Sequence, residues 1–113
     1  MLRSMADLLQ KHCVPCEGGV PALTPGQAKE FLKQTPGWLL DATSTKIGKQ
    51  FTFKNFVEAM EFVKKVAELA ESENHHPDIL VNYSRVTLTL WTHAIGGLSE
   101  NDFIVAAKVN TLA

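Results

Sequence analysis

The spacing of apolar residues changes from helical to alternating at Pro77, and this change limits the folds open to the chain. Between Phe56 and Ala70 the apolar residues recur three and four positions apart, which predicts an amphipathic helix. Pro77 ends the helical region because the residue before a proline is driven out of the α conformation. Residues 78–83 and 85–93 are predicted strands, and the second alternates apolar and polar residues. The sequence therefore predicts a long helix followed by a pair of strands.

The helix predicted from Phe56 to Ala70 is apolar over about half of its circumference. A helix that only covers a sheet needs an apolar stripe a little over roughly 100° wide. The extra apolar surface predicts a second buried contact, most simply with another copy of the chain. The two neighbouring stripes contain Phe56, Met60, Val63, Ala67 and Ala70 in one and Phe62, Val66 and Leu69 in the other.

Three further segments have clear signals for secondary structure. Residues 24–34 are a predicted helix, because Thr24 can act as N-cap and Gln27 completes a capping box. Short β-type runs at 38–40 and 47–53 suggest a hairpin. Near the carboxyl terminus, a serine caps a last helix that contains Phe103, Ile104, Ala107 and Val109.

Composition excludes several classes of protein. A chain of 113 residues suits one domain, and a formal net charge of -1 gives no broad electrostatic surface for nucleic acid. No apolar run approaches the roughly 18 residues of a membrane span, and the amino terminus lacks the layout of a secretory signal. We therefore expect a cytoplasmic protein with no membrane partner and no direct nucleic-acid partner.

Residues 1–23 are expected to form a loosely packed N-terminal arm, because prolines and glycines interrupt any apolar period there. The arm carries both cysteines, Cys13 and Cys16, which are too few for a disulfide framework. With His12 they offer three zinc ligands, but a closed structural site needs a fourth. No metal site is predicted, and the sequence leaves the function of the arm open.

A spaced set of polar residues carries the candidate chemistry. Taken alone, a histidine just past a helix usually interacts with the negative end of the helix dipole, and His93 alone could fill a groove beside Trp91. The occurrence of His75, His76 and His93 in one spaced pattern favours a shared site. Histidine suits proton transfer because its unperturbed pKa is about 6.5. The pattern consists of Glu71, His75, His76, Pro77, Tyr83, His93 and Asp102.

The pattern resembles the pterin-4a-carbinolamine dehydratase family over roughly residues 24–110. Other runs that resemble the family are Gly37-Trp38, Phe51-Thr52-Phe53-Lys54, Thr92-His93 and Gly97-Leu98-Ser99-Glu100, and the Cys13-x-x-Cys16-x-Gly18-Gly19 arm resembles its bacterial branch. The resemblance implies an α+β fold in which a four-stranded antiparallel sheet carries three helices packed on one face, and the order of the segments allows it. Residues 24–113 would form this single dehydratase domain, assembled as a homodimer or homotetramer.

The resemblance also implies a reaction. The expected enzyme removes water from 4a-hydroxytetrahydrobiopterin, the pterin-4a-carbinolamine, and releases quinonoid dihydropterin, which recycles the cofactor of aromatic amino acid hydroxylases. Loss of water needs one proton delivered to the leaving hydroxyl and one removed from the adjacent ring nitrogen, so no metal or organic cofactor is expected. By resemblance His75 and His93 are the catalytic acid–base pair, and His76 is a catalytic residue that lies against the pterin.

Two acidic residues are expected to support the histidines. Glu71 lies near a helix carboxyl end, where an acid is disfavoured, so a histidine partner would compensate it; simple solvation is the alternative. Asp102 also completes a capping box with Ser99, so a purely structural role is equally open. The residues expected to bind substrate are Asn74, His75, His76, Trp91, Thr92, His93, Ala94 and Trp38.

Two other functions remain open at this level. Family members also act as dimerisation partners of transcription regulators, so a protein-binding module, with a transcription-regulator or hydroxylase partner, is one alternative. A metal-dependent hydrolase built on the three histidines and a carboxylate is the other. It has suitable ligand types but no matching ligand spacing.

Overall fold

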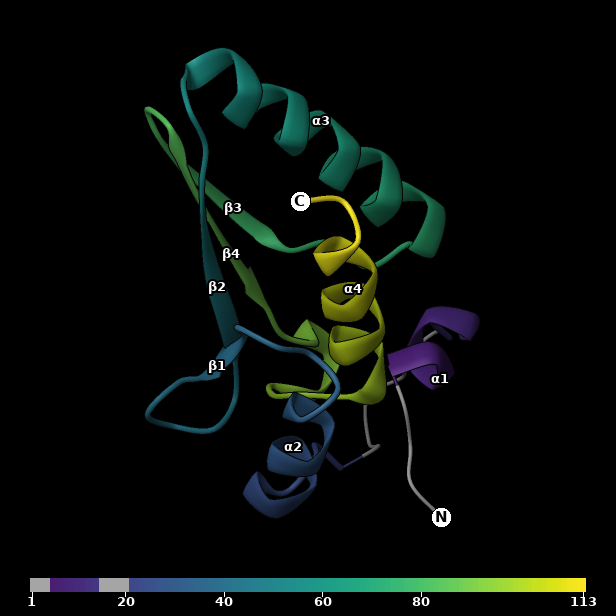
Figure 1. Cartoon of the computed structure of the whole chain (residues 1–113). Helices are drawn as coiled ribbons and strands as arrows, with labels where there is room; N and C mark the ends of the chain where they lie inside the picture. Colours follow the sequence, from purple (N-terminus) through teal and green to yellow (C-terminus); the bar gives the residue numbers. More distant parts are fainter. Residues whose placement is uncertain (1–4, 15–20) are drawn as a thin grey trace.

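The computed structural model describes residues 5–14 and 21–113. Four strands in the described residues form one antiparallel sheet in the order β1-β2-β4-β3, and the helices lie together on one side of it (Figure 1). The predicted α+β fold with a four-stranded antiparallel sheet is confirmed. The elements are α1 (Met5–Gln10), α2 (Pro25–Leu32), β1 (Leu39–Leu40), β2 (Ile47–Thr52), α3 (Phe56–Glu73), β3 (Asp78–Asn82), β4 (Arg85–Leu90), a 3₁₀ turn (His93–Ile95) and α4 (Glu100–Asn110).

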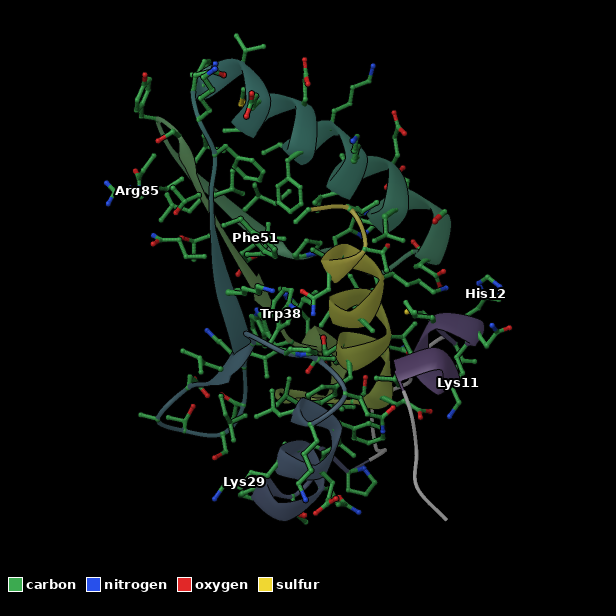
Figure 2. The ribbon with its side chains drawn as sticks, in the orientation of Figure 1. Lys11, His12, Lys29, Trp38, Phe51 and Arg85 are labelled. Carbon is green, nitrogen blue, oxygen red and sulfur yellow. The ribbon has the colours of Figure 1, made fainter. Side chains whose placement is uncertain are left out.

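The core forms on the sheet face that the helices cover. Alternation in β4 turns Val86, Leu88 and Leu90 inward, and all three side chains are fully buried. Their partners on β2 include Ile47, opposite Leu90, and Phe51, opposite Val86. Figure 2 shows Phe51 in the layer between the sheet and the helices.

Helix α4 lies at the centre of the helical layer, in contact with α1, α2 and α3. Residues 101–107 and Val109 are all buried, so this helix is surrounded on nearly every side. Its position matters for the site because Asp102 and Asn101, in its first turn, are buried beside the ends of the other elements.

Helix α3 begins where Asn55 accepts a hydrogen bond from the Glu58 backbone N–H, and it continues to Glu73, three residues beyond the prediction. Residues Ala59, Phe62, Val66, Ala70 and Glu73 form its buried stripe. The other predicted stripe is only partly covered: Phe56 is 49% exposed and Met60 is 40% exposed. Among the described residues, no helix has the length and apolar character needed to cross a membrane.

The described part of the N-terminal arm differs from the loose packing expected. Residues 5–10 form α1, which packs against α4, and Leu8 is 1% exposed within the core. Lys11 then pairs with Glu100 at 2.7 Å. The remainder of the expected arm includes residues 1–4 and 15–20, with Cys16, which lie outside the described residues.

Candidate active site

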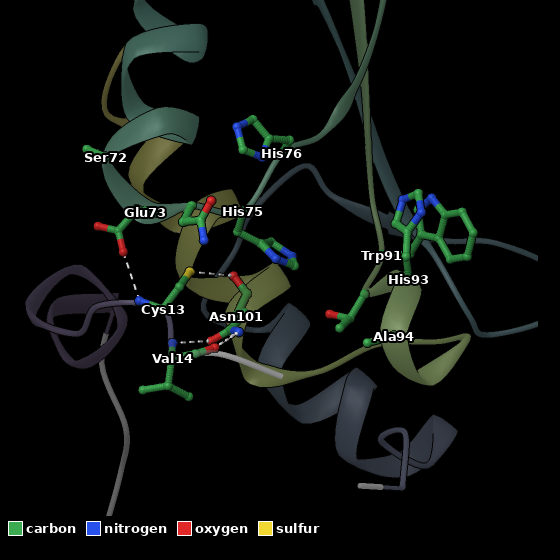
Figure 3. Close-up of a pocket in the computed structure, with 12 residues that line it drawn as sticks. Cys13, Val14, Ser72, Glu73, His75, His76, Trp91, His93, Ala94 and Asn101 are labelled. Atoms are coloured by element: carbon green, nitrogen blue, oxygen red, sulfur yellow. Dashed lines mark hydrogen bonds between the residues drawn. The ribbon is translucent and has the colours of Figure 1, made fainter. Parts of the chain in front are cut away.

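A cavity of about 660 Å³ opens where α3, β4, the 3₁₀ turn, the start of α4 and the N-terminal arm meet (Figure 3). Its volume is in the range of small-molecule sites. It is lined by Cys13, Val14, Ser72, Glu73, Asn74, His75, His76, Trp91, Thr92, His93, Ala94 and Asn101. The structure thus brings together all three predicted histidines and four of the other predicted substrate-binding residues.

The turn that ends α3 positions His75. Asn74 takes the left-handed conformation, with φ of 52°, and its backbone N–H still bonds to carbonyls of the last turn. The chain therefore leaves the helix sharply, with His75 and His76 at the cavity. The side chain of His75 is 12% exposed, and its Nε2 lies 2.6 Å from Oδ1 of Asp102, which is fully buried.

Asp102 is held by several groups at once. Its Oδ2 accepts a hydrogen bond from the Thr92 hydroxyl at 2.8 Å and one from the Ser99 backbone N–H at 3.0 Å. The capping role and the histidine contact that the sequence left as alternatives are therefore made by the two oxygens of one carboxylate. Because a carboxylate only accepts hydrogen bonds, this geometry assigns the Nε2 proton to His75 and leaves Nδ1 as its second functional nitrogen.

His76 has its own carboxylate partner. Its Nε2 lies 2.5 Å from Oε2 of Glu71, in the last turn of α3. Both side chains are exposed, at 53% for His76 and 78% for Glu71. Glu71 does not line the cavity itself, so its contact with the site passes through His76.

His93 reaches the site by a different route from the one predicted. Strand β4 ends at Leu90, so His93 is not a strand residue but the first residue of the 3₁₀ turn. The backbone bridge between Thr92 and Gly97 closes this short loop. The His93 ring stacks on Trp91, with ring centroids 3.9 Å apart and an angle of 24° between the planes.

Trp38, which the sequence predicts to bind substrate, is not among the residues that line the cavity. Gly37, at φ of 86°, turns the chain so that the Trp38 indole enters the core, where it meets Phe51 edge to face. The indole N–H donates to Asn110 at 3.1 Å, and only 3% of the residue is exposed. These contacts explain the placement of Trp38 by packing.

Sequence reasoning missed one side of the cavity, formed by Cys13, Val14, Ser72, Glu73 and Asn101. A signal was present for Glu73, because it continues the buried spacing of α3 and so places an acid in a row of apolar positions. Burial acts to raise the pKa of Glu73, but hydrogen bonds from Lys108, the Cys13 N–H and His12 outweigh it and lower that pKa to about 2. Burial and the nearby Glu73 charge raise the pKa of the Cys13 thiol to about 12, so the thiol is neutral.

The described side chains contain no group of three or more His, Cys, Asp or Glu residues arranged to hold a metal ion. What the site offers instead is three imidazoles, two of them paired with carboxylates, beside an aromatic ring. Such groups can donate and accept protons and can hold a flat heterocycle.

Comparison with known proteins identifies the family. The family model described as pterin 4 alpha carbinolamine dehydratase matches residues 21–112. The chain belongs to this dehydratase family. Its members are hydro-lyases, so the predictions of family and of enzyme class are confirmed.

Two relatives illustrate how much of their own length matches this dehydratase. A protein of Halorhodospira halophila that carries the family name is 50% identical over 106 residues, which is 94% of this chain and 97% of the relative. The mitochondrial pterin-4-alpha-carbinolamine dehydratase 2 of Arabidopsis thaliana is 46% identical, over 96% of this chain and 60% of its own length.

A solved structure agrees with the dehydratase fold. The crystal structure of a transcriptional coactivator/pterin dehydratase from Brucella melitensis has a TM-score of 0.78 and 36% identity, and the match covers 81% of this chain and 98% of that one. A pterin dehydratase-like protein described as a RuBisCO assembly factor of the alpha-carboxysome matches with a TM-score of 0.60 and 26% identity, over 68% of this chain and 89% of that one.

Proposed function

We propose that this chain removes water from 4a-hydroxytetrahydrobiopterin to give quinonoid dihydropterin, and so recycles the cofactor of aromatic amino acid hydroxylases. The observation that carries the proposal is that His75, fixed by a buried carboxylate, and His93, stacked on Trp91, border one cavity from different elements (Figure 3). Two separately positioned imidazoles are what this elimination needs.

The bond changes in the proposed step balance without an oxidant or reductant. The bond from C4a to the hydroxyl oxygen breaks, the proton on the adjacent ring nitrogen N5 is removed, and a C4a–N5 double bond forms as water leaves. One group must protonate the departing hydroxyl, and another must take the N5 proton. General acid–base catalysis of this kind contributes about 10²- to 10⁴-fold for each group.

His75 is assigned to the removal of the N5 proton. When Nδ1 takes a proton, the ring becomes an imidazolium whose other N–H already faces the Asp102 carboxylate at 2.6 Å. A buried carboxylate stabilises such an imidazolium and fixes its orientation. His93 is then assigned to the leaving hydroxyl, because it is the other cavity histidine placed on a separate element.

His76 and Trp91 are assigned to substrate binding. The exposed His76 ring, oriented by Glu71, can contact a polar edge of the pterin. Trp91 lines the cavity, and its ring stacks on the His93 ring and so helps to fix its orientation. Asn74, Thr92 and Ala94 complete the wall near the histidines.

Dehydration of a synthetic 4a-hydroxypterin in the presence of a metal chelator tests the proposal. The purified protein should accelerate the reaction, with the same rate before and after chelation, because proton transfer alone accounts for the step. Loss of activity in chelator and its return with zinc would contradict the proposed mechanism and favour the metal-dependent alternative.

A further inference from the structure

Cys13 and Val14 of the N-terminal arm form part of the cavity wall, although both lie outside the range matched by the family model. We propose that residues 13 and 14 form the substrate-binding wall opposite Trp91 and His93, that Glu73 and Asn101 hold this wall in place, and that it selects the substituent carried by the reduced pterin. This inference rests on the proposed function and names the determinant of its specificity.

Glu73 fixes the arm through its buried carboxylate, whose side chain is 4% exposed. Oε1 accepts a hydrogen bond from the Cys13 backbone N–H at 2.8 Å. Oε2 lies 2.6 Å from Lys108 and 3.1 Å from Nδ1 of His12. Two of these three partners belong to the arm. If the arm moved away, the buried carboxylate would keep Lys108 but lose its other two hydrogen-bond partners, which is strongly unfavourable.

Asn101 binds Val14, the residue after Cys13, through both polar groups of the Val14 backbone. Its Oδ1 accepts from the Val14 backbone N–H at 3.1 Å, and its Nδ2 donates to the Val14 carbonyl at 2.6 Å. Asn101 itself is 4% exposed. Together with the buried Leu8 and the Lys11–Glu100 pair, these bonds make the arm a fixed part of the wall.

The position of the arm indicates which part of a substrate it contacts. Figure 3 shows Cys13 and Val14 on one side of the cavity, Trp91 and His93 on the other, and His75 between them. A pterin whose C4a–N5 edge reaches the histidines therefore directs another part of its structure towards the arm. The neutral Cys13 thiol and the Glu73 carboxylate, whose charge Lys108 compensates, leave that side without net charge, which favours an uncharged substituent.

The test compares two substrates, a 4a-hydroxypterin with a hydroxylated three-carbon substituent and one with only a methyl group. Glu73→Gln removes the carboxylate charge that holds the arm, and Cys13→Leu places a larger side chain in the wall and so narrows the cavity. Each should raise KM for the larger substrate by about fivefold or more relative to the methyl substrate, while kcat falls less than KM rises. Thr24→Ala is the matched control, because it removes the N-cap of α2, which does not line the cavity, and should leave both KM values unchanged.

Hydrogen exchange supplies a readout besides activity. Saturation with 7,8-dihydrobiopterin should slow exchange of the Cys13 and Val14 amides, and 6-methyl-7,8-dihydropterin should slow it less. If the wild type binds both dihydropterins and turns over both 4a-hydroxypterins, but exchange in the arm and the KM ratio of both variants are unchanged, the inference is overturned and the proposed function stands. If the wild type binds neither dihydropterin and dehydrates neither 4a-hydroxypterin, the proposed function fails and the inference fails with it.

Discussion

At the scale of single residues, the account depends on the pairing of His75 with Asp102. The sequence showed the residue types and their spacing but could not decide between a cap and a catalytic support for Asp102. Only the fold shows that the two carboxylate oxygens serve both purposes, because the choice depends on how α4 lies against the end of α3. The position of Trp38 could not be predicted either, because nothing in its local sequence shows that the indole turns into the core.

The first prediction concerns the two proposed proton-transfer residues. His75→Ala and His93→Ala should each lower kcat for dehydration by about 10²-fold or more, because each variant lacks one acid–base group. Both should keep the fold, since neither side chain belongs to the apolar core. Circular dichroism checks the fold. Wild-type turnover by both variants would show that the acid–base roles are assigned to the wrong residues.

A second prediction isolates the role of the Asp102 charge. Asp102→Asn keeps the size of the side chain but removes the charge that stabilises an imidazolium at His75, so kcat should fall by about 10²-fold while KM changes much less. The rate should also depend differently on pH, which a purely structural cap would not cause. An unchanged kcat and pH profile would leave Asp102 only its capping role.

At the scale of elements, the local signals gave the helices and strands of residues 24–113 but not the ends of all of them. The capping box at Thr24 marked the start of α2 correctly. The alternation of β4 suggested a strand through His93, whereas the bridge from Thr92 to Gly97 turns the chain earlier. Helix α1 was missed because its stability comes from burial of Leu8 against α4, a contact that no local pattern reveals.

Attachment of the arm to α3 should depend on pH through Glu73. The pKa of this group is lowered from 4.5 to about 2, so the stability it contributes is present above about pH 4.5 and is lost as the pH falls towards 2. Lys108, His12 and Cys13 are the groups that face it. Glu73→Gln should therefore lower the free energy of unfolding by about 2 kcal/mol at pH 7, with a smaller difference near pH 3.

Urea unfolding of both proteins at the two pH values measures this difference. The Thr24→Ala variant serves as control, because the loss of a neutral cap should lower stability by a similar amount at both pH values. A gap between Glu73→Gln and the wild type that is the same at pH 7 and pH 3 would show that the carboxylate charge does not stabilise the docked arm.

At the scale of the whole molecule, an apolar surface near the start of α3 is exposed. It consists of Phe56, Val57 and Met60 near the start of α3, which are 49%, 64% and 40% exposed. The wide apolar stripe predicted from the sequence indicated such a surface.

We expect the protein to be a homodimer or homotetramer that buries this surface. Sedimentation velocity at micromolar concentration should show a species larger than 12.5 kDa. Val57→Lys should shift the protein towards smaller species, because it places a charge in the apolar patch. Glu68→Lys, farther along the same helix, is the matched control and should not. A wild type that sediments as a monomer would contradict this expectation, and the apolar surface would then have another partner or none.

The most direct test of the central claim is a single-turnover measurement with metal-free protein in excess over a chemically defined 4a-hydroxytetrahydropterin, followed across the neutral pH range. The account predicts rapid release of quinonoid dihydropterin by the wild type, with a rate that falls at both low and high pH, because the step needs one group that donates a proton and one that accepts a proton. His75→Ala should lose most of the acceleration in the same experiment. A wild-type rate equal to that of the uncatalysed reaction, or a His75→Ala rate equal to that of the wild type, would contradict it.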